Sequence, residues 1–426
     1  MNFKQEAEFW FIVGSQHLYG EEALQKVAAH AQQMAAGFNA AGRLPAKVVY
    51  KLVATTSDAI EQVIEDANYE KKCAGIITWM HTFSPSKMWI RGLVKLQKPY
   101  LHLHTQFNRE IPNEGIDMDF MNLNQSAHGD REHGFIGARL RLARKVVVGY
   151  WEDEAVQQKM AAWMRVALGV MDSRRLKIAR FSDNMRDVAV TEGDKVEAQV
   201  RLGWSVNTYP VGELVTYIDA VKDAEIDAMM KTYEDKYTMD TENIASVRYQ
   251  AKLEAAMQKF LEKGGFEGFV NHFDDLYGME QLPGLAVQDL TAQGYGFGPE
   301  GDWKVAALAR VMKAMAQGDD KGTALMEDYT YNFAPNGESL ILGAHMLEVC
   351  PSVAAGRPKI EVHPLGIGGK DDPARLVFEG KAGPAITASL IDMGGRMRLI
   401  VQDVEAVKPI LPMPNLPVAR VMWKPQ

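Results

Sequence analysis

Short apolar runs alternate with helix-like stretches throughout the first 150 residues, and this alternation limits the possible folds more than any other feature. Apolar residues recur with helical spacing in residues 21–41, and Ser84 and Pro85 predict the start of another helix that continues through Leu96. Strand, helix and strand in one sheet give a right-handed crossover, so we expect a parallel sheet covered on both faces. The predicted strands are residues 8–13, 47–53, 75–80, 100–104 and 145–150.

The loops 16–19 and 81–84 follow two of these strands. Ligands of open parallel sheets bind beyond the carboxyl ends of the strands, so we expect both loops at the edge of a binding site. A dinucleotide fingerprint would place further glycines after the first strand, but Gly14 is followed by Ser-Gln-His-Leu. Residues 366–370 resemble a phosphate loop only in composition, because the spacing is wrong and Asp371 would repel phosphate.

The character of the sequence changes twice along the chain. A second α/β unit begins near Leu176, and after about Gly322 short strand-like runs are separated by glycine and proline. In this last part, Met393-Gly394-Gly395-Arg396 predicts a tight hairpin turn. The expected fold class is therefore α/β, with two Rossmann-like parallel-sheet domains followed by an incomplete β-barrel-type C-terminal domain. The expected domains are residues 1–175, 176–321 and 322–426.

Composition and charge exclude several classes of partner. The net charge is 47 − 55 = −8, and no lysine- or arginine-rich block is present, which argues against nucleic acid and anionic membranes. No run approaches the roughly 20 apolar residues of a membrane-spanning helix, and the N-terminus lacks the pattern of a secretory signal. The two cysteines, Cys73 and Cys350, cannot build a disulfide framework, so we expect a cytoplasmic protein.

Three side chains are candidates for chemistry, although each also has a simpler explanation. Glu300 precedes a predicted helix and would there complement the helix dipole. Glu327 lies beside strand-like aromatic residues and points either inward or to solvent. His345 lies on an apolar strand, where a histidine is more commonly a hydrogen-bonded core residue. Together, two carboxylates and an imidazole suit a hard divalent ion such as Mn²⁺ and leave positions open for sugar oxygens.

Nine motifs, in the expected order along essentially the whole chain, resemble those of the L-arabinose isomerase family. They are WFIVGSQHLYG (10–20), HTFSPSKMW (81–89), DMDFMNLNQSAHG (117–129), GFIGAR (134–139), DNMRDVAVTEGDKV (183–196), EGDWK (300–304), MEDYTY (326–331), HMLEVCPS (345–352) and GIGGKDDPARL (366–376).

The resemblance implies a hexamer with active sites between subunits and one Mn²⁺ per subunit. Glu300, Glu327 and His345 match metal ligands of the family, and the two glutamates also match its catalytic acid/base pair. His128, in a polar and loop-like stretch, matches a residue that reaches the site from a neighbouring subunit. The positions that match the lining of the sugar pocket are Gln16, Leu18, Phe83, Met185, Phe273 and Ile367.

The reaction implied by the resemblance is the conversion of L-arabinose to L-ribulose, the first step of L-arabinose catabolism. It leaves open D-galactose, with D-tagatose as the product, as a second substrate. Such an aldose–ketose isomerisation passes through an enediol, for which one group moves the C2 proton to C1 and another moves protons between O1 and O2. Two carboxylates share these duties if their environments separate their pKa values. No organic cofactor is needed.

The resemblance ends early at the C-terminus. Family members continue past the segment that matches residues 416–424, and the continuation carries a histidine that is the fourth protein ligand of the metal. Here the sequence stops at Gln426, and its last histidine is His363. We therefore expect weaker metal binding, and weak or absent activity unless the chain is part of a longer product. We also expect residues 418–423 to form an unpaired apolar edge.

Two alternatives stay open on sequence alone. One is a related ketol-isomerase of the L-fucose type, against which the matches at the pocket positions argue. The other is a sugar-binding fragment whose catalysis is impaired by the missing fourth ligand, since tandem α/β domains also build such proteins. Comparing turnover of L-arabinose with that of L-fucose distinguishes the first alternative, and the activity of Glu300→Ala and Glu327→Ala distinguishes the second.

Overall fold

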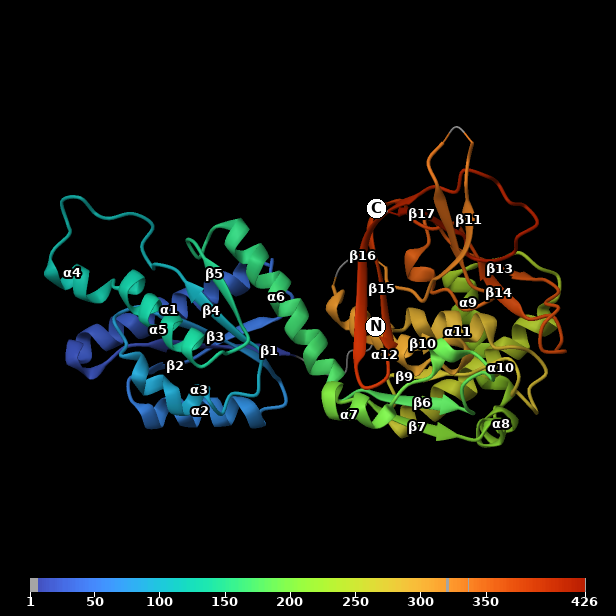
Figure 1. Ribbon diagram of the computed structural model, residues 1–426, viewed down its shortest axis with the longest axis horizontal. Helices are drawn as coiled ribbons and strands as arrows, with labels where there is room; N and C mark the ends of the chain where they lie inside the picture. Colours follow the sequence, from blue (N-terminus) through green and yellow to red (C-terminus); the bar gives the residue numbers. More distant parts are fainter. Residues whose placement is uncertain (1–6, 319–321, 336, 426) are drawn as a thin grey trace. The chain divides into compact units, whose positions relative to one another are not determined.

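The computed structural model describes residues 7–318, 322–335 and 337–425, which form two compact units. The N-terminal unit ends at Met171 and the C-terminal unit begins at Asp172. Each unit contains a parallel sheet with helices on both faces (Figure 1). The predicted α/β class is therefore confirmed.

The sheet of the N-terminal unit has five strands in the order β2-β1-β3-β4-β5. Every neighbouring pair in it is parallel, as the alternation of strands and helices predicts. The strands are β1 (Glu8–Gly14), β2 (Lys47–Ala54), β3 (Cys73–Met80), β4 (Tyr100–His104) and β5 (Arg144–Val148).

Alternate residues of β1 pack into two separate cores on opposite faces of this sheet. Phe9 and Phe11 lie in the core that contains residues of α1 and α6, and Trp10 and Ile12 lie in the core that contains residues of α2, α3 and α5. The helices are α1 (Gly20–Ala40), α2 (Ser57–Tyr69), α3 (Ile90–Leu93), α4 (Met118–Leu123), α5 (Ser126–Arg139) and α6 (Glu154–Ser173).

The prediction of one helix from Ser84 through Leu96 is wrong in both the start and the length of the helix. The chain instead forms a 3₁₀ turn, η2 (Ser86–Trp89), followed by the four residues of α3. Pro85, not Ser84, occupies the N-cap position of η2, and no side chain caps this turn. The Ser84 hydroxyl instead accepts a hydrogen bond from the Trp89 indole (3.1 Å).

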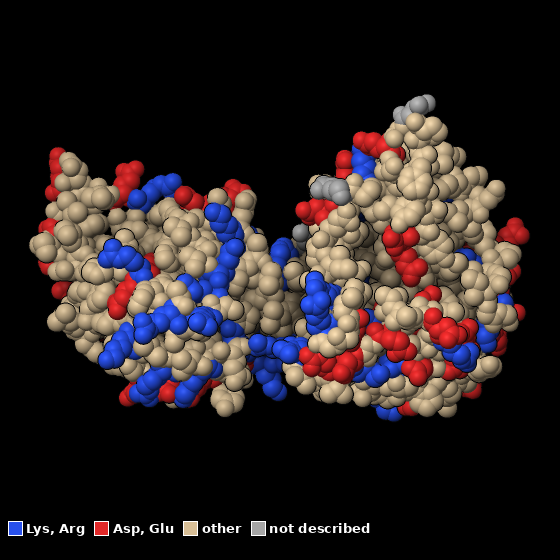
Figure 2. All heavy atoms as spheres, in the orientation of Figure 1, with Lys and Arg blue, Asp and Glu red and all other residues tan. Residues whose placement is uncertain are grey.

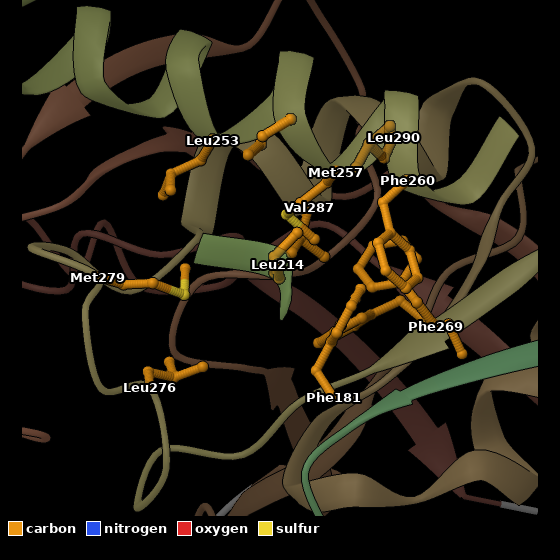
Figure 3. Packing of buried hydrophobic residues seen from close by; sticks show 14 of the residues in the cluster. Phe181, Leu214, Leu253, Met257, Phe260, Phe269, Leu276, Met279, Val287 and Leu290 are labelled. Atoms are coloured by element: carbon orange, nitrogen blue, oxygen red, sulfur yellow. The ribbon is translucent and has the colours of Figure 1, made fainter. Parts of the chain in front are cut away.

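The main sheet of the C-terminal unit is also entirely parallel, with the order β10-β9-β6-β7. One face packs against α8, α10 and α11, where the rings of Phe181, Phe260 and Phe269 gather (Figure 3). The opposite face packs against α7 and α12. These elements are β6 (Lys177–Phe181), α7 (Lys195–Leu202), β7 (Ser205–Tyr209), α8 (Val211–Asp219), α10 (Ile244–Gly264), β9 (Gly268–Val270), α11 (Gly284–Ala292), β10 (Gly296–Gly298) and α12 (Trp303–Met315).

Two further sheets complete this unit. One has the order β14-β13-β8, and the other is antiparallel with the order β11-β12-β17-β16-β15. The remaining elements are α9 (Asp223–Lys236), β8 (Thr238–Met239), β11 (Glu327–Asn332), β12 (Leu340–Ala344), β13 (Lys359–Val362), β14 (Ala374–Val377), β15 (Gly383–Asp392), β16 (Met397–Val407) and β17 (Val421–Pro425).

The antiparallel sheet agrees with two predictions about the C-terminal part, the hairpin turn and the incomplete barrel, and corrects a third, the unpaired edge. The hairpin turn lies between β15 and β16 as expected, with Gly394 and Gly395 at positive φ. Among the described residues the sheet is open rather than closed into a barrel, with β11 and β15 at its edges. Residues 418–423 do not form an unpaired edge, because β17 pairs with β12 on one side and β16 on the other.

The surface charge, the two cysteines and the lengths of the helices can be compared with what the composition predicts. Both acidic and basic side chains lie on each unit in the face shown in Figure 2. Cys73 and Cys350 are both buried and free. None of the described helices is long and apolar enough to cross a membrane.

A buried polar cluster joins α9, α10 and α11. Glu254 and Asp289 are both fully buried, and the Gln293 amide donates to each of them (2.9 Å). Tyr233 donates to Glu254 (2.5 Å), and Lys236 donates to Asp289 (2.8 Å). Burial raises the pKa of Glu254 well above its usual value, and the neighbouring Asp289 raises it further. The surroundings therefore disfavour the charged form of Glu254 next to Asp289.

We predict that Glu254→Gln flattens the dependence of stability on pH. A folded-state pKa above the unfolded value gives stability that is complete below the unfolded pKa and is lost as the pH rises through the folded pKa. Glutamine stays neutral at every pH, so the variant should lose less free energy of unfolding than the wild type as the pH rises above the ordinary pKa of a glutamate, as measured by urea denaturation. Glu262→Gln, at an exposed position of α10, is the control. An equally steep loss in Glu254→Gln would contradict the assignment.

Candidate active site

In the N-terminal unit, the predicted sugar-lining residues gather at the carboxyl edge of the sheet. Gln16 follows β1, and its side-chain amide donates to the carbonyl of Phe83, which follows β3 (3.0 Å). The ring of Phe83 lies 4.6 Å from that of His128. Leu18, in the 3₁₀ turn η1 (His17–Tyr19), is 82% exposed. The predicted position of both loops at one edge agrees with this arrangement.

His128 lies in the first turn of α5, not in a loop as its polar surroundings suggested. The helix can approach the end of β3 closely because the next residue is Gly129, where a Cβ would lie 2.6 Å from the Thr82 carbonyl oxygen. Asp130 then anchors the helix: its carboxyl accepts hydrogen bonds from the Met80 amide (3.1 Å) and contacts His102 (2.9 Å). The exposed His128 side chain is therefore presented from a firmly held helix.

In the C-terminal unit, three loops at the carboxyl edge of the main sheet carry predicted site residues. Met185 follows β6, Phe273 follows β9 and Glu300 follows β10. The Met185 amide donates to the Glu300 carbonyl (2.9 Å), so two of these loops are in direct contact. Ile367 packs against the same apolar core as Met185 and Phe273. Four residues from separate parts of the sequence therefore converge.

The local sequence suggested that Glu300 belongs to the first turn of the following helix, but Glu300 lies outside α12. It lies in a 3₁₀ turn, η4 (Pro299–Gly301), with a φ of +55° that non-glycine residues seldom adopt. Asp302 caps α12 instead, accepting hydrogen bonds from the amides of Lys304 and Val305. Such strained backbone is typical of functional sites, where the surrounding structure holds it in place.

The register of β11 and β12 brings Glu327 beside His345. Glu327 pairs with Ala344, the residue before His345, and Glu327 Oε1 lies 3.7 Å from His345 Nε2. The ring of Phe273 stacks on the His345 imidazole at 6.2 Å. His345 is thus neither a simple core histidine nor a surface one, because it is buried with one ring nitrogen facing a carboxylate.

Glu348 also belongs to this group, although no specific sequence motif points to it. Its Oε2 lies 2.5 Å from His345 Nδ1 and also accepts a hydrogen bond from the Leu347 amide (3.1 Å), and its side chain is buried. A carboxylate on one imidazole nitrogen fixes the ring and leaves the other nitrogen as the ligand atom, as in many metal sites. The only sequence signal is the spacing His-x-x-Glu, which is not specific.

The charges around His345 suit a cation. Burial by itself lowers the pKa of the imidazole, but the carboxyls of Glu348, Glu327 and Glu300 raise it to about 9. Burial raises the pKa of Glu327, and the neighbouring Glu300 and Glu348 raise it further. A proton on the imidazole therefore neutralises part of a concentrated negative charge, a role that a divalent cation bound by these oxygens and nitrogen would take over.

Glu327 and His345 are in contact, but the three predicted ligands do not form a complete metal site. Within residues 7–318, 322–335 and 337–425, no group of three or more histidine, cysteine, aspartate or glutamate side chains is close enough to hold an ion as it stands. The donor types nevertheless fit a hard divalent ion. Residues 366–370 do not form a phosphate loop, because the Lys370 ammonium donates to the carbonyls of Leu276 and Met279.

Comparison with known proteins gives the family of this chain. Three family models match it in order: the L-arabinose isomerase N-terminal domain at residues 3–175, the central domain at 177–318 and the C-terminal domain at 322–426. The chain belongs to the L-arabinose isomerase family. The resemblance in its motifs is thereby confirmed.

Curated members of the L-arabinose isomerase family are similar over nearly the whole chain. The L-arabinose isomerase of Geobacillus kaustophilus (strain HTA426) is 60% identical, and the alignment covers 98% of this chain and 85% of that protein. That of Geobacillus stearothermophilus is 59% identical with the same coverage. That of Thermotoga neapolitana (strain ATCC 49049 / DSM 4359 / NBRC 107923 / NS-E) is 57% identical over 99% of this chain and 85% of that protein.

We predict that Glu348→Gln weakens metal binding without unfolding the protein. Glutamine keeps the size of the side chain but removes the charge that orients His345, so affinity for Mn²⁺ should fall by roughly 10–100-fold. Isothermal titration of the metal-free protein with MnCl₂ measures this. Glu361→Gln, at the carboxylate that contacts His363 (2.6 Å), is a matched control on a second histidine. Unchanged affinity in Glu348→Gln would show that this carboxylate does not support the site.

Proposed function

We propose that this chain converts L-arabinose to L-ribulose through an enediol, and that D-galactose, which yields D-tagatose, is a second substrate. One observation carries the proposal: in a member of this family, Glu327 Oε1 lies 3.7 Å from His345 Nε2, Glu348 supports the imidazole, and the charges of Glu327 and Glu300 both raise the pKa of His345. These are the residue types that moving a proton between adjacent carbons requires.

In this proposal Glu300, Glu327 and His345 hold one Mn²⁺ per subunit. Two carboxylate oxygens and one imidazole nitrogen suit Mn²⁺, and Glu348 keeps Nε2 of His345 directed toward Glu327. When bound, the ion supplies a Lewis acid that stabilises negative charge developing on the sugar oxygens.

The two glutamates divide the proton transfers. One takes the proton from C2 and returns it to C1, and the other serves the hydroxyl and carbonyl oxygens. Burial and the neighbouring Glu300 raise the pKa of Glu327, which favours a group that accepts and returns a proton. His345, held by Glu348, keeps its fixed orientation during these steps. The ring of Phe273 lies nearly parallel to the imidazole, with the ring centres 6.2 Å apart.

The proposed sugar-binding residues lie at the carboxyl edge of the sheet of each unit, and each edge is considered by itself. The proposed lining is Gln16, Leu18, Phe83, His128, Met185, Phe273 and Ile367. The exposed side chains of Leu18 and His128 suit contact with a sugar bound to another subunit, so we include a homohexamer with sites between subunits. The proposal also includes three domains, with boundaries near residues 175 and 321, and a cytoplasmic location, which suits two free cysteines.

We predict that Glu300→Gln and Glu327→Gln each lower kcat for L-arabinose by about 10²–10⁴-fold, because glutamine keeps the shape of the side chain but cannot carry the proton. Conversion of L-arabinose to ketose at saturating MnCl₂ measures the loss. Asp328→Asn is the control, because Asp328 is exposed and follows Glu327 on β11, where successive side chains point to opposite faces. Near wild-type turnover in either glutamine variant would refute the assignment of the pair.

Metal removal gives a separate prediction. Dialysis against EDTA should abolish turnover, and MnCl₂ should restore it better than MgCl₂, because an imidazole ligand suits Mn²⁺ better than Mg²⁺. Metal content measured on the same samples ensures that the dialysed protein is free of metal. Full turnover by a metal-free sample would contradict the proposed site, and turnover of L-fucose in preference to L-arabinose would contradict the proposed substrate.

A further inference from the structure

Asn184 lies at the centre of the contacts between the loops that follow β6 and β10. Its side chain is 6% exposed, and its Oδ1 accepts a hydrogen bond from Arg180 Nη2 (2.8 Å). Its Nδ2 donates to the carbonyls of Thr191 (2.7 Å) and Gly301 (3.5 Å). Arginine has no acceptor and a carbonyl has no donor, so these partners determine which end of the amide faces which group.

The backbone of Asn184 also supports the turn that contains Glu300. A Cβ on Gly301 would lie 2.7 Å from the Asn184 Cα and 2.5 Å from the Asp183 carbonyl oxygen, so only glycine allows the turn to come this close. The next amide, that of Met185, donates to the Glu300 carbonyl (2.9 Å). The strained Glu300 is therefore held through the residues on either side of Asn184 and through its side chain.

Lys304 extends these contacts to the start of α12. Its buried ammonium donates to the Thr191 carbonyl (2.7 Å), the same oxygen that accepts from Asn184, and lies 3.0 Å from the Asp302 carboxylate. Asp302 in turn caps α12, two residues after Glu300. The Thr191 carbonyl thus accepts hydrogen bonds from two side chains, those of Asn184 and Lys304, which contact the two residues that follow Glu300.

We propose that Asn184 is a positioning residue that holds the Glu300 carboxylate in its working place. This inference rests on the proposed function of Glu300 and adds the residue that maintains its backbone conformation. A φ of +55° at a non-glycine residue persists only where the surroundings enforce it, and Asn184 supplies that enforcement through two donors and one acceptor. Loss of the donors lets the turn relax, which moves the carboxylate.

The isosteric change Asn184→Asp tests this most sharply. Aspartate keeps an oxygen for Arg180, so the contact within the β6 loop survives, but it places a second oxygen against the carbonyls of Thr191 and Gly301. We expect kcat for L-arabinose to fall by about 10–100-fold, with kcat carrying most of the loss in kcat/KM. Affinity for MnCl₂, measured by isothermal titration without sugar, should fall over the same range.

Gln250→Ala is the matched control in the same unit. Gln250 is a fully buried amide that donates to the carbonyl of Leu282 (2.8 Å) and the side chain of Gln281 (2.8 Å), far in sequence from the Glu300 turn. It should lower the melting temperature while leaving kcat and Mn²⁺ affinity within a few-fold of the wild type. Asn184→Ala, which removes all three contacts, should reproduce the losses of Asn184→Asp. If Asn184→Ala does not fold, Asn184→Asp alone decides.

The outcomes separate this inference from the proposed function. If Glu300→Gln is inactive but Asn184→Asp keeps both its kcat and its Mn²⁺ affinity, the proposed function stands and the positioning role is wrong. If Asn184→Asp only lowers the melting temperature, as Gln250→Ala does, its role is structural and the inference is also wrong. If Glu300→Gln itself stays active, the proposed function fails first, and the role of Asn184 fails with it.

Discussion

Parallel pairing of β6, β9 and β10 is the constraint on which the candidate site of the C-terminal unit depends. It brings the carboxyl ends of three strands to one edge, so that the loops carrying Met185, Phe273 and Glu300 begin as neighbours. It also shapes the Glu300 turn, because the Gly301 amide donates to the Asn271 carbonyl just after β9 (2.8 Å). The strained backbone at Glu300 persists because these contacts with neighbouring loops hold it in place.

Antiparallel pairing supplies the other half of the site. The register of β11 on β12 decides that Glu327 faces His345, and a shift of one residue would turn Glu327 to the opposite side. Glu348 then orients the imidazole through its contact with Nδ1 of His345. A buried ion pair is a weak source of stability, so the orientation it gives to His345 explains its presence better than folding energy does.

Local patterns predicted the parallel sheets and their binding edges, because buried strands and amphipathic helices are encoded by neighbouring residues. These patterns gave wrong predictions where contacts with residues distant in the sequence determine the structure. Residues 418–423 looked like an exposed edge, yet β17 lies inside the sheet between β12 and β16. Glu300 looked like a first-turn acid, yet its positive φ arises from contacts with the β6 and β9 loops. Neither Glu348 nor Asn184 stands in a sequence spacing that is specific for chemistry, so local patterns do not predict their roles.

The sequence by itself therefore determined the α/β class and the family resemblance, and it predicted two glutamates and a histidine as candidate site residues, because these depend on residue identity and short-range periodicity. Only the tertiary structure decided which groups meet. It paired Glu348 with His345, seated His128 on a helix rather than a loop, and placed Asn184 against the Glu300 turn. The contact of Asn184 with Gly301 joins residues that are far apart in the chain, and the other two features depend on the backbone conformation. Local sequence specifies neither.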